Sequence, residues 1–126
     1  MIDLRYQLTV TLPDGPRKAV TDVLTVEAYD VFAVTLDPAP AAGATQTLQL
    51  LSAAAAATVT FVMVTASVYQ DVSYDFAASG TARALDGPQL LIGAGAVSLL
   101  PAPTTITLVN TSAEPRAVEI LIGRDL

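Results

Sequence analysis

The chain has 126 residues, enough for one domain with a substantial hydrophobic core, and we expect residues 1–126 to form that single domain. Only 14% of its residues are charged, whereas soluble domains average about 25%, so its surface is unusually apolar. The net charge is −6, and the six basic residues are too scattered to form a phosphate-binding patch. Cysteine and histidine are absent, which excludes disulfides, thiolate or histidine metal sites, and Ser–His–Asp or Cys–His catalysis.

The first predicted element is a strand over residues 2–12. Hydrophobic and polar side chains alternate there, which is typical of a strand with one side in the core and the other in solvent or at an interface. The "PDGP" of residues 13–16 predicts a turn, because proline fixes φ and glycine accepts positive φ. Residues 19–38 predict two further strands with a break near Tyr29 and Asp30.

The middle of the chain predicts more strands. Residues 45–50 form one, and the alanine run of residues 52–57 is too short for a stable helix, so we expect a loop or a single helical turn. Residues 58–76 predict one long strand or two. Apolar residues occur on both faces of this segment, which indicates a central strand or one at a subunit contact.

A membrane helix is the alternative for residues 50–69, which are uncharged and about as long as a bilayer is thick. However, they consist mainly of Ala, Thr, Ser and Val, and no Lys or Arg lies beside them to set an orientation. The β-branched alternation from Thr58 onward favours a strand, so we expect no membrane partner.

Residues 90–100 predict a strand interrupted at Gly93 and Gly95 by a bulge or a close backbone approach. The segment "TTITLVNTSAEPRAVEILIG", residues 104–123, predicts a pair of strands around a polar break. In its first arm Ile106 and Leu108 share a face, and in its second arm three aliphatic residues share one: Val118, Ile120 and Ile122.

Turn signals about every dozen residues divide the chain into about eight or nine strands. The fold class is therefore all-β, and we expect a single-domain antiparallel β-sandwich or jelly roll.

The strongest acidic candidates are Asp71 and Asp75 in "YQDVSYDF". On one strand, a spacing of four places both carboxylates on the same face, where they could bind a hard cation or act as a glycosidase pair. Dedicated calcium loops place oxygen ligands more densely, so two solvated aspartates beside a turn are the simpler interpretation. We expect no catalytic residue and no cofactor.

Three aromatic residues are candidates for contact with a partner or ligand: Tyr69, Tyr74 and Phe76. Carbohydrate-binding modules present flat aromatic platforms, but Tyr69 and Tyr74 have opposite parity and would lie on opposite faces of one strand. Packing in the core or at an interface is the preferred interpretation.

The low charge, the Ala/Thr/Val-rich composition and the ending "TTITLVNTSAEPRAVEILIGRDL" resemble the small all-β accessory virion proteins of tailed bacteriophages, of the head decoration or cement type. The resemblance implies a non-enzymatic structural protein, made in the host cytoplasm, that stabilises the outer capsid surface. It implies as partners further copies of the chain, as a homotrimer or another homo-oligomer, together with the major capsid protein or neighbouring virion proteins.

The chemistry of the chain agrees with this role, because cementing a shell needs apolar contact area and strand edges that can pair with a neighbour. A tail, neck or baseplate component fits equally well. A carbohydrate- or ligand-binding β-sandwich module is the alternative of a different class, and nucleic acid is not an expected partner.

Overall fold

The computed structural model describes residues 1–126 and confirms the all-β class. There are ten strands: β1 (Ile2–Thr11), β2 (Arg17–Val26), β3 (Ala28–Leu36), β4 (Thr45–Gln49), β5 (Val59–Ala66), β6 (Val72–Phe76), β7 (Arg83–Ala84), β8 (Gln89–Ile92), β9 (Thr105–Asn110) and β10 (Arg116–Arg124). The helical segments are single turns: the 3₁₀ turn η1 (Ala42–Ala44), α1 (Ala53–Ala56) and α2 (Ala94–Val97). None of the helices is long and apolar enough to cross a bilayer.

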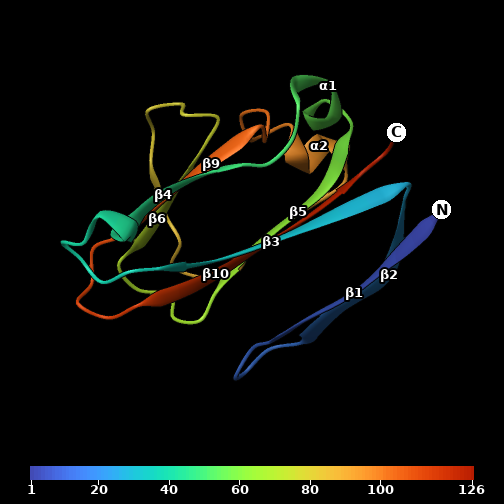
Figure 1. Ribbon diagram of the computed structural model, residues 1–126. Coiled ribbons are helices and arrows are strands. Elements are labelled where there is room, and N and C mark those ends of the chain that lie inside the picture. Colours follow the sequence, from blue (N-terminus) through green and yellow to red (C-terminus); the bar gives the residue numbers. More distant parts are fainter.

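Eight strands form two antiparallel four-stranded sheets that lie face to face (Figure 1). Sheet I has the strand order β3-β10-β5-β8, and sheet II has the order β4-β9-β6-β7. The remaining strands, β1 and β2, pair only with each other and form an N-terminal hairpin outside the two layers.

The hydrophobic core lies between sheets I and II, as the period-two pattern predicts. Ile106 and Leu108 of β9 point into it from sheet II, and Ile120 of β10 points into it from sheet I, all with no exposed surface. The prediction of a central strand near residue 60 is also confirmed, because β5 pairs with β10 on one side and β8 on the other.

The prediction that residues 104–123 form a strand pair is wrong. Both strands exist, but β9 belongs to sheet II and β10 to sheet I, so the intervening loop crosses between the layers. The buried side chain of Asn110 organises this crossing: its Nδ2 donates to the carbonyls of Asp37 (3.1 Å) and Glu114 (2.8 Å). These side-chain bonds take the place of the backbone hydrogen bonds that would join β9 and β10 in a hairpin.

Two other boundaries differ from the sequence prediction. The break in residues 19–38 falls at Glu27 rather than at Tyr29, because β2 stays with β1 in the hairpin whereas β3 joins β10. Gly93 makes no bulge. With φ of +94° it ends β8 and precedes α2, and its N–H donates to the carbonyl of Thr60 at 2.7 Å.

Candidate assembly interface

The N-terminal hairpin has one apolar face and one polar face. Its antiparallel register places Leu8 opposite Val20 and Val10 opposite Lys18, so these side chains share a face. We call this surface the apolar hairpin face. Its members are Ile2, Leu4, Tyr6, Leu8, Val10, Lys18, Val20, Asp22, Leu24 and Val26.

The root of the hairpin is fixed to the outside of sheet I at Gly123. A Cβ atom at Gly123 would lie 2.9 Å from Leu4 Cδ1 and 3.2 Å from both Val26 Cγ1 and Phe61 Cβ. The hairpin therefore packs directly against the backbone of β10, and it covers Phe61, which is only 4% exposed although it faces away from the core. Only glycine permits this close approach.

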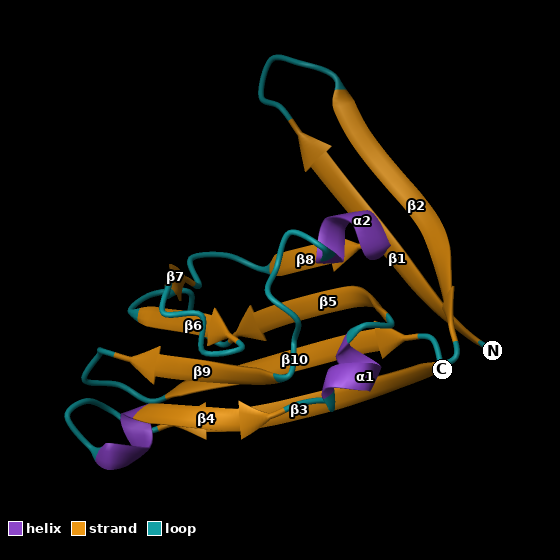
Figure 2. Cartoon of the chain, turned by 90° about the horizontal axis from the view of Figure 1, so that it is seen from above, coloured by secondary structure: helices purple, strands orange, loops and turns teal.

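The tip half of the hairpin has no such support. It diverges from sheet I in Figure 1, and in Figure 2 it extends far beyond the rest of the molecule. Leu8, Val10 and Leu12 are consequently 50%, 50% and 51% exposed. A two-stranded hairpin is at best marginally stable in water, and clustered exposed aliphatic side chains mark contact surfaces.

The outer face of sheet I, which points away from the core, is also apolar. On β3 it exposes Tyr29 (52%) and Val31 (59%). The cross-strand register gives the members of this outer sheet face as Tyr29, Val31, Ala33, Thr35, Phe61, Met63, Thr65, Leu90, Ile92, Ala117, Glu119, Leu121 and Gly123. Glu119 is its one charged residue.

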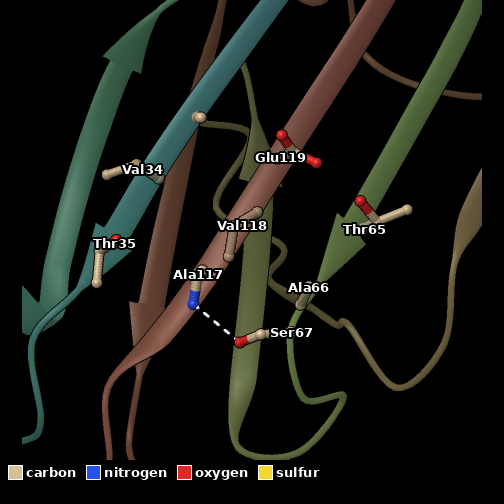
Figure 3. A pocket seen from close by; sticks show the side chains of 9 residues that line it. Val34, Thr35, Thr65, Ala66, Ser67, Ala117, Val118 and Glu119 are labelled. Atoms are coloured by element: carbon tan, nitrogen blue, oxygen red, sulfur yellow. Dashed lines mark hydrogen bonds between the residues drawn. The ribbon is translucent and has the colours of Figure 1, made fainter.

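A shallow hollow of about 420 Å³ lies at one end of the outer sheet face (Figure 3). It is open because Ala33 and Ala117 leave room between larger neighbours, and Glu119 stands at its rim on β10. Ser67 is bonded twice to Ala117 in its floor: the N–H of Ala117 donates to Ser67 Oγ at 3.1 Å, and the N–H of Ser67 donates to the carbonyl of Ala117 at 2.8 Å. This surface can receive aliphatic side chains, and the Glu119 carboxylate at its rim can pair with a cation beside them.

The structure brings together two of the three predicted aromatic residues. Tyr74 and Phe76 both point into the core from β6, with ring centroids 5.7 Å apart in an edge-to-face arrangement. They line a second hollow, of about 260 Å³, between the two sheets, beside Arg83 and Gln89. Tyr69 precedes β6, packs half-buried against the core and does not line this hollow.

The Tyr74 hydroxyl lies at the polar side of this second hollow and donates to Gln89 Oε1 at 3.3 Å. Burial raises the pKa of Tyr74. The nearby Arg83 lowers the pKa of Tyr74 and Asp86 raises it, but both have smaller effects than burial. The phenol therefore stays neutral and serves as a hydrogen-bond donor.

The two predicted acidic candidates do not share a strand face. Asp71 precedes β6 and has φ of +61°, so the even spacing to Asp75 does not align the carboxylates. Asp75 instead caps the following turn: its Oδ1 accepts from the backbone N–H of Ser79 at 3.2 Å and its Oδ2 accepts from Gly80 N–H at 3.0 Å. No group of three or more metal-binding side chains occurs in the chain.

The Asp75 turn makes a testable pH prediction. The hydrogen bond from the Ser79 hydroxyl is the main cause that lowers the pKa of Asp75; burial opposes it, and the backbone N–H groups of Gly80 and Ser79 lower the pKa further. The turn is therefore stabilised at neutral pH, and this contribution is lost in acid, as the pH falls through the lowered pKa. We expect Ser79→Ala to move the Asp75 carboxyl titration, followed by NMR, to higher pH.

Thr81→Ala is the matched control, because Thr81 also lies in this exposed turn and its side chain makes no hydrogen bond to Asp75. An equal shift in both variants would show that the Ser79 hydroxyl has no specific role.

The sequence pattern missed the extent of the exposed apolar surface. The alternation in residues 2–12 indicates an apolar face correctly, but only its root half reaches the body of the protein. The apolar character of both faces around residue 61 was the available signal for the outer sheet face. No protein-family model, curated protein or solved structure matches the chain.

Proposed function

We propose that the chain is a non-enzymatic structural protein of a viral particle, which decorates and cements the capsid from its outer surface through oligomeric β-sheet contacts. The unsupported N-terminal hairpin carries this proposal. Its half-exposed Leu8, Val10 and Leu12 would be a liability in a free monomer, but they are suited to a protein that works by contact with its neighbours.

We also propose that the two sheets form a jelly roll, an architecture common in viral capsid and lectin domains. The nested pairing of the strands supports this proposal. β3 pairs with β10 and β4 with β9, while the strands between them pair as β5 with β8 and β6 with β7. A long double strand rolled into two layers produces this pairing.

The hollow beside Tyr74 and Phe76 is the observation in favour of a carbohydrate- or ligand-binding module. Its two rings are only 4% and 3% exposed, so they do not offer the open platform on which a sugar ring stacks. The exposed hairpin and outer sheet face present much more apolar surface, which favours the structural role.

Particle composition tests the proposal. In particles purified on a density gradient from cultures that carry the gene, we expect the chain at a copy number comparable to that of the shell protein, measured by quantitative mass spectrometry. The physical reason is that cementing requires contact at each repeat of the shell.

A few copies per particle would instead indicate a tail, neck or baseplate component. Recovery of the chain only at the top of the gradient, apart from particles, would contradict a role in the virion.

A further inference from the structure

The apolar hairpin face and the outer sheet face of one molecule meet only at the root of the hairpin. The root of the hairpin is held at Gly123 by Leu4 and Val26, which fixes the direction in which the hairpin leaves the body. Its tip half then diverges from sheet I, as Figures 1 and 2 both show. The tip half of the apolar hairpin face and the part of the outer sheet face beyond the hairpin root are therefore each left open by the same chain.

The tip half of the apolar hairpin face and the outer sheet face carry opposite charges, because Asp22, the other charged residue of the hairpin face, lies in its root half opposite Tyr6. Lys18 lies on the apolar hairpin face, because its cross-strand neighbour is Val10. Glu119 is the one charged residue of the outer sheet face. The single salt bridge of the chain joins Arg124 and Asp30, so Lys18 and Glu119 are both without an ionic partner.

The shapes of the surfaces agree with this pairing of charges. Glu119 stands at the rim of the 420 Å³ hollow that Ala33 and Ala117 leave open. Val10 lies directly opposite Lys18, at about 5 Å between Cβ atoms. A hairpin that places Lys18 beside Glu119 of another molecule can therefore also place Val10 over the hollow.

We propose that the tip half of the hairpin of one copy packs on the outer sheet face of a second copy, with Lys18 beside Glu119. This proposal deepens the proposed function by naming the contact through which the subunits associate. Each copy gives one hairpin and receives one, so the copies form a closed oligomer where the rotation between them closes and an open chain of copies where it does not. A stable interface buries roughly 800 Å² on each partner. Because each copy contributes both a hairpin and an outer sheet face, two contact areas per copy add toward this value.

Charge reversal tests the contact. By size-exclusion chromatography with light scattering at micromolar concentration, we expect the wild-type chain to have the mass of an oligomer. Lys18→Glu and Glu119→Lys should each raise its dissociation constant about 10- to 100-fold, because like charges then face each other. The double variant Lys18→Glu/Glu119→Lys should recover the oligomer, since the pair is restored in reverse.

Arg17→Glu is the matched control. Arg17 is the sequence neighbour of Lys18, but its register partner Thr11 places it on the polar face of the hairpin. We expect this variant to keep the oligomer. All three changed positions lie on the exposed surface, so circular dichroism should show the same strand content in every variant.

Three results would overturn the proposal: a wild-type monomer at all concentrations, equal dissociation by Arg17→Glu and Lys18→Glu, or a double variant that stays monomeric. The proposed function fails separately. An oligomer with charge rescue that is absent from particles would contradict the virion role alone, whereas a particle-bound monomer would contradict the hairpin contact alone.

Discussion

Replacement of Leu108 by alanine is expected to lower the free energy of unfolding by about 3–4 kcal/mol. Leu108 has no exposed surface and lies in the middle of β9, with Gln46 of β4 and Tyr74 of β6 as its register neighbours. Truncation removes buried aliphatic atoms and leaves a cavity between the sheets, because β9 is held on both sides and cannot move into the space.

Leu99→Ala is the matched control, since it deletes the same atoms at a site that is 76% exposed. Its effect should stay within about 0.5 kcal/mol. Urea unfolding followed by circular dichroism, at one fixed protein concentration because association adds to stability, measures both variants. Equal losses of stability in the two variants would contradict the placement of Leu108 in the core.

Asn110→Ala is expected to lower the free energy of unfolding by about 2–4 kcal/mol, although it removes a polar side chain. The Asn110 side chain is 1% exposed, and besides its two donated bonds its Oδ1 accepts from the backbone N–H (3.0 Å) and hydroxyl (2.8 Å) of Ser112. Alanine would leave the carbonyls of Asp37 and Glu114 without this donor in a place with little access to water.

Glu114→Ala is the control for the loop. It removes an exposed side chain but keeps the backbone carbonyl to which Asn110 donates, so we expect little change in stability. Asn110→Asp should be at least as harmful as Asn110→Ala at neutral pH, because a carboxylate cannot donate to either carbonyl. A wild-type unfolding midpoint in Asn110→Asp would show that the two donated bonds contribute nothing.

Local patterns in the sequence predicted the strands and their faces well. Ile106 and Leu108 are buried as expected, and so are the alternate residues of β10, because a period-two pattern depends only on which side of a strand meets the core. The single turn at residues 53–56 also agrees with the prediction, with Ser52 Oγ accepting from the N–H of Ala55 as an N-cap.

The partners of the strands could not be predicted in the same way. Alternation defines a face but not a sheet, so β9 and β10 looked like a hairpin although they lie in opposite layers. The buried position of Asn110 depends on Asp37, which is 73 residues away in sequence. Long-range contacts of this kind leave no local pattern.

The lack of a local signal also explains why the acidic pair and the covered half of the hairpin were not predicted correctly. The positive φ of Asp71 separates it from the face of Asp75, and nothing in "YQDVSYDF" indicates that conformation. Likewise, the alternation in residues 2–12 cannot reveal where the support of the body ends. Only the close approach at Gly123 defines which half of the hairpin is covered.

The nested strand pairing has a consequence for the order of folding. β3, the first strand of the two-layer body, pairs with β10, the last, and their register joins Ala28 to Arg124. The centre of sheet I therefore cannot form until β10 has left the ribosome, so the body must fold after synthesis of this segment. Such distant pairings slow folding, because the chain loses the entropy of closing a long loop before the stabilising contacts between the strands form. The hairpin, whose strands are neighbours in sequence, can form early, so its apolar face is exposed before the body is complete.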